Sequence, residues 1–473
     1  MKFHIVTLGC AKNEVDSEGI EVLLTEAGHS PAGQRSEADV VIVNTCGFIN
    51  AATEESLGSL RALAAEKKPG GYLVAAGCLA QRDGGKLMSQ VAGIDAVIGC
   101  RSWPDITRLV DAISRSSVIS HQLSALSPQP SALRTQDPEP RTLSHSPTFP
   151  VTPAPVFLGP DLQLGIFKRR PRPGSAYVKI SDGCDASCAF CAIPSIKGSY
   201  KSKPREAILE EVRQLAAGGA REVVLVGQDS SAYGLDRGEK DGLAGLLREI
   251  ADAAPGLPWL RILYLYPRRI TPELLRTMAG LPQLCKYVDI PLQHTHPAVL
   301  RRMNRPKGDV AELVAGIREA IPGVAIRTTF IVGFPGETAA EHNYLLRSME
   351  SLRLDHVGVF AYSPQVGTPA ASMPGQVSEH TRQRRWREAM EVAQKVSLRQ
   401  NKKQVGRELD VLVEGAETPE DGREPMMAGR SYRDAPEVDG LVLFSGRAVV
   451  GEIVRVRITA ALEYDLVGEV VTG

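Results

Sequence analysis

Cys184, Cys188 and Cys191 are spaced closely enough to bind one metal cluster. They follow an apolar segment (176–183) that is predicted to be a strand, so they should lie on the loop at its carboxyl end. Three thiolates can hold three irons of a four-iron cluster, which leaves the fourth iron open to a substrate or cofactor. A zinc site or a set of buried thiols is the alternative. Because the flanking loop offers no further His or Cys as a fourth zinc ligand, the spacing favours the cluster.

A second set of cysteines lies far apart in the sequence, but each member ends a predicted strand: Cys10, Cys46 and Cys78. The carboxyl ends of parallel strands share one edge of a sheet, so these three thiols should converge. One such cysteine would be a small core residue. Three in equivalent places favour a second cluster with an open iron. Cys100 also ends a predicted strand and could be a fourth ligand; we favour a packing thiol there, and a structural role for Cys285.

The elements that must position these cysteines form three predicted domains joined by a linker. Apolar segments alternate with helical patterns in residues 1–115, which predicts an α/β domain with a doubly wound parallel sheet. The alternation resumes in residues 173–403 as six β/α units, which predicts a partial parallel barrel. Residues 404–473 read as short alternating strands and predict a small all-β barrel. Nine Pro and eight Ser among the 50 residues 116–165 indicate that 116–172 is a linker or insert.

The predicted strands and helices have definite limits. In the first domain we expect strands at 3–8, 40–44, 72–76 and 96–98, and helices at 17–27 and 53–65. In the central domain we expect strands at 177–180, 222–226, 262–266, 288–290, 325–332 and 356–360, followed by a basic helix at 380–403. In the last domain we expect strands at 408–413, 441–443 and 453–458.

Composition sets broad limits on function. Lys+Arg and Asp+Glu are both 55, and this balance argues against a dedicated nucleic-acid binder. The sequence contains no run of 18 apolar residues, so we predict no membrane span. The amino-terminal apolar run is too short for a secretory signal. We therefore predict a cytoplasmic protein, in which cysteines more often bind metals or do chemistry than form disulfides.

Together these features resemble the methylthiotransferase family of radical S-adenosylmethionine (SAM) enzymes, with a methylthiotransferase domain, a radical SAM partial barrel and a TRAM barrel. Phe190 occupies the aromatic position between the last two cysteines of the cluster motif. Several segments resemble the RimO branch, which modifies an aspartate of a small-subunit ribosomal protein. These segments are Thr7–Ser17, Val178–Cys184, Gly227–Gly234, Leu263–Pro267, Asp289–His294 and Gly429–Gly440. Cys100 and the 116–165 insert depart from the family pattern.

The resemblance implies two 4Fe-4S clusters, SAM and a division of labour between the clusters. The cluster on Cys184, Cys188 and Cys191 would cleave SAM to a radical that removes hydrogen from the aspartate β-carbon of the twelfth small-subunit ribosomal protein. The cluster on Cys10, Cys46 and Cys78 would deliver sulfur, and a second SAM would supply the methyl group. The implied SAM contacts are Phe190, Gln228, Asp229, Arg327, Gly333 and Glu337; for Gln228, Asp229 and Arg327, capping, strand-end hydrogen bonds or an internal ion pair are the alternatives.

Charge gives a separate indication of the partner. Residues 404–473 hold 7 Lys+Arg and 14 Asp+Glu, so their net charge is 7 − 14 = −7. An acidic barrel should repel a phosphate backbone and attract a basic ribosomal protein, although solvated surface charge is the plain alternative. The basic tract 168–172 and the helix near 382–387 are possible contacts with ribosomal RNA. The reductant and the sulfur donor are not identified by the sequence.

Three other functions fit part of the pattern. The same chemistry on a transfer-RNA adenosine is the nearest, and the acidic barrel disfavours it. A non-catalytic iron–sulfur electron carrier, or a sensor that docks on the ribosome, would not cleave SAM. A plain SAM-dependent methyltransferase would not need six cluster-type cysteines.

Overall fold

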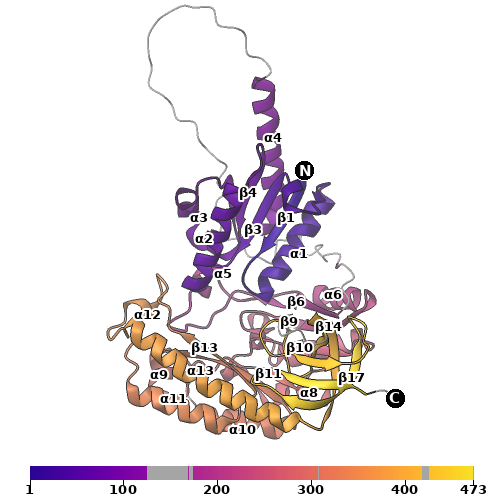
Figure 1. The fold of residues 1–473 in the computed structure, drawn as a ribbon. Coiled ribbons are helices and arrows are strands. Elements are labelled where there is room, and N and C mark those ends of the chain that lie inside the picture. Colours follow the sequence, from indigo (N-terminus) through magenta and orange to yellow (C-terminus); the bar gives the residue numbers. More distant parts are fainter. Residues whose placement is uncertain (125–168, 170–173, 307, 418–424, 472–473) are drawn as a thin grey trace, which may run out of the picture. The chain divides into compact units, whose positions relative to one another are not determined.

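A computed structural model describes residues 1–124, 169, 174–306, 308–417 and 425–471 (Figure 1). The predicted linker lies largely outside these residues, as does most of the basic tract 168–172. The chain divides into two compact units. The first comprises Met1–Leu162 with Ser195–Gly198, and the second comprises Gln163–Pro194 with Ser199–Gly473.

The first unit contains a five-stranded parallel sheet in the order β2-β1-β3-β4-β5, which confirms the doubly wound α/β prediction. Helices α1 and α4 pack together, and the apolar sides of α2 and α3 cover β3, β4 and β5 on the other face (Figure 1). The strands are β1 (Lys2–Thr7), β2 (Ser30–Pro31), β3 (Val40–Thr45), β4 (Tyr72–Ala76) and β5 (Ala96–Gly99). The helices are α1 (Ala11–Glu26), α2 (Asn50–Ala65), α3 (Gly77–Gln90) and α4 (Ile106–Ser124).

The second unit begins with six parallel strands, and this confirms the partial barrel. They are β6 (Gly174–Lys179), β9 (Ala220–Val226), β10 (Trp259–Ile262), β11 (Tyr287–Asp289), β12 (Ala325–Val332) and β13 (His356–Ala361). They form two sheets, β10-β9-β6 and β11-β12-β13, which a parallel bridge between Leu260 and Leu284 connects. The predicted strand 262–266 was wrong in its limits. Tyr264 has a φ of 64°, which ends the extended conformation after Ile262.

Helices surround these strands and bury one continuous apolar core, which includes Val178, Leu225, Ile262, Val288 and Phe330. The longer helices are α6 (Arg205–Ala217), α7 (Gly242–Ala253), α8 (Pro272–Gly280), α10 (Val310–Ala320), α11 (Ala339–Leu352) and α13 (Glu379–Asn401). Shorter elements are β7 (Ser181–Asp182), β8 (Lys201–Ser202), α5 (Ile193–Lys197), α9 (Pro297–Arg302) and α12 (Pro369–Ser372).

The chain ends in a closed five-stranded barrel in the order β14-β15-β16-β18-β17, as the all-β prediction required. Its strands are β14 (Glu408–Glu417), β15 (Met426–Ser431), β16 (Val442–Ser445), β17 (Ile453–Ala461) and β18 (Leu466–Val470). Strands β15 and β18 were not predicted. Each contains a glycine, Gly429 or Gly468, whose missing side chain allows close approach to the backbone of a neighbouring strand.

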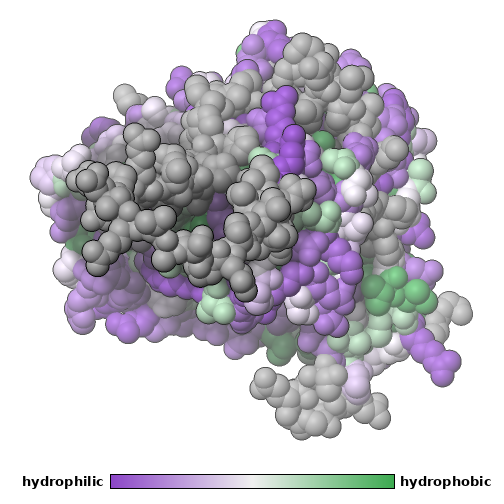
Figure 2. All heavy atoms as spheres, turned by 90° about the horizontal axis from the view of Figure 1, so that it is seen from above, coloured by the Kyte–Doolittle hydropathy of each residue, from purple (hydrophilic) through white to green (hydrophobic). Residues whose placement is uncertain are grey.

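Within the described residues, no helix is long and apolar enough to cross a bilayer. Most of the coloured residues in the view of Figure 2 are hydrophilic, and hydrophobic side chains occupy smaller areas between them.

Candidate active site: two cysteine triads

The first unit brings the predicted amino-terminal cysteines to one edge of its sheet. Cys10 immediately precedes α1, Cys46 directly follows β3, and Cys78 is the second residue of α3. Because β1, β3 and β4 are neighbours in the sheet, their carboxyl ends place these residues side by side. Burial, with a smaller contribution from the nearby thiols of Cys78 and Cys10, raises the pKa of Cys46 to about 11.

Two glycines make this convergence possible. Gly9 has a φ of 100°, and a Cβ atom there would lie 2.7 Å from the Cβ of Cys46. Gly77 has a φ of 94°, and a Cβ atom there would lie 2.6 Å from the carbonyl oxygen of Thr45. Any larger residue would push the strand ends apart. Ser56 also holds the backbone of Cys46, because its hydroxyl accepts from the Cys46 N–H at 3.0 Å and donates to the carbonyl at 2.9 Å.

Asn13 contacts all three cysteine-bearing segments, and our sequence interpretation missed its role. Its amide Nδ2 donates to the carbonyl of Leu8 at 2.7 Å and to that of Thr45 at 3.3 Å. Its Oδ1 lies 4.0 Å from the sulfur of Cys78, and its backbone N–H donates to the carbonyl of Cys10. The side chain is buried. Its place within the segment Thr7–Ser17 was the available signal.

Cys100 lies beside Cys78, so it belongs to the surroundings of this triad. A hydrogen bond with Cys100 and burial together raise the pKa of Cys78 well above its usual range. The sulfur of Cys100 lies 3.8 Å from the carbonyl oxygen of Ile196, in the short segment 195–198. Lys197 of this segment forms a buried ion pair with Asp16 at 3.2 Å. Whether Cys100 is a packing thiol or a fourth cluster ligand stays a prediction.

The second triad lies on the loop after β6 and β7, as predicted. The N–H of Ala186 donates to the sulfur of Cys184, and the N–H of Ile193 donates to that of Cys191, each at 3.4 Å. Such bonds stabilise thiolates, which are the form that binds iron. Burial is the main reason that the pKa of Cys184 is raised to about 11 and that of Cys191 to about 12. The nearby Cys188 thiol contributes to both increases.

Two side chains that the sequence analysis did not single out adjoin this triad. A guanidinium nitrogen of Arg305 lies 3.6 Å from the sulfur of Cys188. Arg305 also stacks on the ring of Tyr266, with its central carbon 4.3 Å from the ring centroid. Tyr266 lies in the segment Leu263–Pro267 that supported the family resemblance, but Arg305 had no such signal. A cation and an aromatic face therefore stand next to the thiolates.

Gln228 and Asp229 follow β9 at the same edge. Asp229 is buried, forms an ion pair with Arg269, and accepts a hydrogen bond from Ser231 at 2.6 Å. Desolvation raises the pKa of Asp229, although Arg269 opposes this effect. The buried Oε1 of Gln228 has no hydrogen-bond partner among the described residues. An acceptor in this state is suited to a ligand that can donate, such as an ammonium group.

The remaining predicted SAM contacts have partners within the chain. Phe190 packs against a buried apolar cluster that contains Met303 and Phe334. Glu337 accepts from the N–H groups of Gly333 and Phe334 and pairs with Arg385 at 3.1 Å. Burial raises the pKa of Glu337 to about 7, while Arg385 opposes the shift.

Arg327 forms ion pairs with Asp289 at 3.1 Å and with Asp439 of the carboxyl-terminal barrel at 3.2 Å. These contacts correspond to the internal ion pair that the sequence analysis left open. A SAM contact for Phe190, Glu337 or Arg327 stays a prediction.

The donor chemistry of both triads fits the clusters that the sequence predicts. Within the described residues, no group of three His, Cys, Asp or Glu side chains is arranged to hold a metal ion. Cluster ligation differs from such a site, because each thiolate binds a different iron of the cluster. Cys285 lies outside both triads; it is buried, and burial raises its pKa to about 12.

Comparisons with known proteins give the family. The Uncharacterized protein family UPF0004 model matches residues 2–99, the Radical SAM superfamily model matches 178–349, and the TRAM domain model matches 405–471. The radical SAM match implies one 4Fe-4S cluster and SAM. A solved radical SAM methyltransferase, TsrM from Kitasatospora setae, covers 78% of the chain and 77% of its own length with a TM-score of 0.52. At 16% identity, this likeness concerns the fold alone.

Curated relatives match along the whole chain. The ribosomal protein uS12 methylthiotransferase RimO of Roseiflexus sp. (strain RS-1) is 47% identical over 100% of this chain and 97% of its own length. The enzyme of that name from Chloroflexus aurantiacus is 46% identical over 99% of each chain. This chain belongs to the RimO family of radical SAM methylthiotransferases.

Proposed function

We propose that this protein adds a methylthio group to the β-carbon of an aspartate in ribosomal protein uS12. The observation that carries the proposal is the pair of cysteine triads, each at the carboxyl edge of its own parallel sheet. The relatives that match along the whole chain are named ribosomal protein uS12 methylthiotransferases. The C–H bonds of the aspartate β-carbon are not acidic enough for an ordinary general base to remove a proton at neutral pH.

The second unit would perform the radical half of the reaction. When bound, a 4Fe-4S cluster with SAM supplies the one-electron chemistry that removes hydrogen from an unactivated carbon. Cys184, Cys188 and Cys191 would hold the cluster. Arg305 would place its positive charge against the Cys188 thiolate, and the free Oε1 of Gln228 would orient the amino group of SAM.

The first unit would hold a second cluster on Cys10, Cys46 and Cys78 and present sulfur for transfer. Asn13 would hold the segments before Cys10 and Cys46 together through its two donated hydrogen bonds, and its Oδ1 would hold Cys78 beside them. The partner would be a basic ribosomal protein, attracted by the acidic carboxyl-terminal barrel.

The proposed function is tested first by mass spectrometry of uS12 purified from cells that contain or lack this protein. We expect an enzyme-dependent methylthio group on one aspartate, located by tandem mass spectrometry. An unmodified uS12 together with enzyme-dependent methylthioadenosine in transfer RNA would overturn the proposal. Absence of any change in either molecule would favour a non-catalytic iron–sulfur protein.

Serine variants of the six cysteines then separate the two sites. Changes at Cys184, Cys188 or Cys191 should abolish SAM cleavage, whereas changes at Cys10, Cys46 or Cys78 should retain cleavage and abolish the methylthio product. Each set should remove about half of the bound iron, because each cluster contributes four of the expected eight or so irons. Cys285→Ser is the matched control and should leave iron and product unchanged. Normal product from the amino-terminal variants would contradict the two-cluster assignment.

A further inference from the structure

Arg269 is a partly exposed cation at the carboxyl edge of the six-stranded core. It ends the short 3₁₀-helix Pro267–Arg269, which follows β10. Its side chain is 28% exposed, whereas the side chain of its ion-pair partner, Asp229, is 3% exposed. Asp229 follows β9, which is the neighbouring strand. The pair therefore joins a buried carboxylate to a guanidinium that reaches solvent.

Hydrogen bonds around Asp229 fix the direction of the Arg269 side chain. The hydroxyl of Ser231 donates to one oxygen of the Asp229 carboxylate at 2.6 Å and accepts from the N–H of Tyr266 at 2.9 Å. The other carboxylate oxygen accepts from Nη1 of Arg269. The backbone N–H of Arg269 donates to the carbonyl of Tyr266 at 2.8 Å. The loop after β10 is thereby tied to the loop after β9, which holds the guanidinium in place before a ligand binds.

Arg269 is also close to the second cysteine triad. Its central carbon lies 5.1 Å from the centroid of the Tyr266 ring, and that of Arg305 lies 4.3 Å from the same centroid. Arg305 in turn contacts the sulfur of Cys188. Burial raises the pKa of Cys184, and the charge of Arg269 is near enough to oppose this increase. Arg269 thus borders the place where hydrogen would be removed from the substrate.

The Arg269 side chain has hydrogen-bond donors that the described part of the chain does not use. Within that part, it donates from Nη1 to Asp229 alone. A guanidinium carries its N–H groups in one plane, so Nε and Nη2 can bind a second carboxylate through two parallel bonds. Arg305 differs, because it is buried and its terminal nitrogens donate to Cys188 and to the carbonyl of Pro291. Of these two cations, Arg269 is therefore better placed to bind a further anion.

We propose that Arg269 binds the carboxylate of the substrate aspartate. This inference rests on the proposed function. The hydrogen to be removed is on the carbon that bears this carboxylate, which is the charged group of the aspartate side chain. An ion pair with a guanidinium that is already fixed would hold the β-carbon in one place, as a reaction between positioned groups requires. The same contact would select aspartate over asparagine, whose amide has the same shape but no charge.

The test measures how well the enzyme discriminates between aspartate and asparagine in its substrate. Full-length, cluster-loaded enzyme is used with SAM but without a reductant, so that uS12 binds and is not modified. Fluorescence anisotropy gives the dissociation constants of natural uS12 and of uS12 with asparagine at the modified position. For the wild type, we expect asparagine to weaken binding about 10- to 100-fold, as for the loss of hydrogen bonds between charged groups. For Arg269→Met, this difference between the two forms of uS12 should disappear.

Arg268→Met is the matched control, because it removes the same charge from the adjacent, exposed position of the same short helix. It should discriminate as the wild type does. Arg269→Met also leaves the buried Asp229 without its partner, which disturbs the neighbouring SAM site. Such a disturbance affects both forms of uS12 alike and cancels in their ratio. Arg269→Lys keeps a charge beside Asp229 but lacks the planar fork, so its discrimination should be intermediate.

The outcomes separate this inference from the proposed function. A wild-type enzyme that modifies uS12 in cells but binds both forms equally would contradict the role of Arg269 and leave the function standing. A preference for aspartate that persists in Arg269→Met, with weaker binding of SAM, would assign Arg269 to SAM and overturn the inference. A preference that depends on Arg269 in an enzyme that never modifies uS12 would support the aspartate contact and contradict the function. Absence of uS12 binding to the wild type would contradict both.

Discussion

At the scale of single residues, the amino-terminal triad depends on a side chain that ligates nothing. Asn13 joins the loop before Cys10 to the loop before Cys46 and places its oxygen against Cys78. Its amide nitrogen donates to two backbone carbonyls, a partly buried one at Leu8 and a buried one at Thr45. Removing the donor leaves these carbonyls unsatisfied, which costs about 1–3 kcal/mol for each buried group.

Asn13→Ala should therefore loosen one triad and spare the other. We expect loss of up to half of the iron, loss of the methylthio product and retention of SAM cleavage, measured by iron analysis and by release of 5′-deoxyadenosine. Asn304→Gly is the reciprocal control. Asn304 donates to Ser187, next to Cys188, and glycine suits its φ of 52°. This variant should impair SAM cleavage. Equal effects of the two variants on cleavage would contradict separate roles for the two asparagines.

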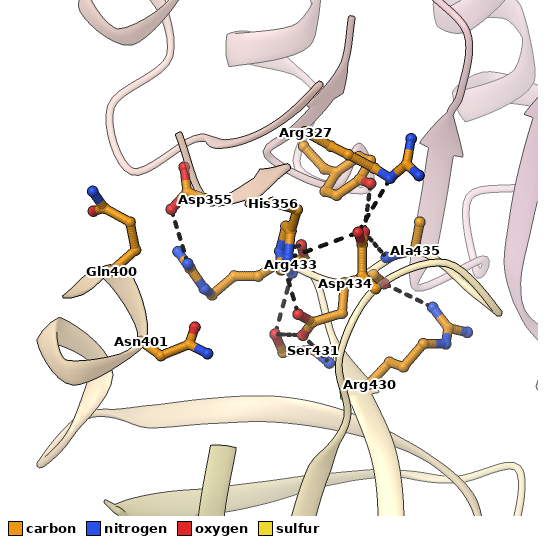
Figure 3. A network of polar contacts seen from close by, with 12 residues as sticks. Arg327, Asp355, His356, Gln400, Asn401, Arg430, Ser431, Arg433, Asp434 and Ala435 are labelled. Atoms are coloured by element: carbon orange, nitrogen blue, oxygen red, sulfur yellow. Dashed lines mark hydrogen bonds and ion pairs between the residues drawn. The ribbon is translucent and has the colours of Figure 1, made fainter. Parts of the chain in front are cut away.

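At the scale of elements, the barrel is fixed to the core by buried charge rather than by apolar packing alone (Figure 3). Asp355 precedes β13, and its carboxylate forms ion pairs with two arginines that differ in their exposure to solvent. Arg433 comes from the barrel and is 4% exposed, whereas Arg318 comes from α10 and is 32% exposed. A buried charge that loses its partner is far more costly than an exposed one.

Comparing these two arginines tests how the barrel is held. Arg433→Met should weaken the barrel's attachment by about 3–5 kcal/mol and speed hydrogen exchange in β14 and β15. Arg318→Met, which removes a partly exposed partner of the same carboxylate, should cost about 1 kcal/mol or less. Hydrogen-exchange mass spectrometry measures both. Similar exchange rates in the two variants would show that buried charge does not hold the barrel.

At the scale of the whole molecule, the polarity of the parallel strands sorts functions to opposite ends. The cysteines and the proposed SAM contacts Gln228, Gly333 and Glu337 follow carboxyl ends, whereas the barrel is attached toward amino-terminal ends, where it also engages Arg327. That attachment includes a buried carboxylate between two arginines, Glu222 with Arg261 and Arg430. Burial by itself would raise the pKa of Glu222, but Arg430 and Arg261 hold it at about 2.

The lowered pKa of Glu222 predicts a dependence of stability on acid. Its contribution is complete above its ordinary pKa of 4.5 and is lost as pH falls from there toward 2. The contribution is on the order of 3 kcal/mol, since each unit of pKa corresponds to about 1.4 kcal/mol. Urea unfolding should show the wild type well above Glu222→Gln in stability at pH 6 and the gap narrowing at pH 3. A gap of constant size would contradict the buried ion triad.

The sequence by itself determined the local elements and the residues that end them. Strand and helix periods are local properties, and the carboxyl ends of parallel strands meet by topology, so the two triads could be placed without coordinates. The limits of β10 and the existence of β15 could not be found this way. A positive φ at Tyr264 and the pairing around Gly429 depend on neighbours distant in the chain.

Only the tertiary structure decided which polar groups meet. Arg327 pairs with Asp439, Arg305 meets Cys188, and Cys100 lies against Cys78. Such contacts leave no periodic trace in the sequence, because an ion pair or thiol contact can join any two positions that folding brings together. The same holds for charge: the net −7 of residues 404–473 was readable from composition, but its division into buried, paired and exposed carboxylates required the barrel.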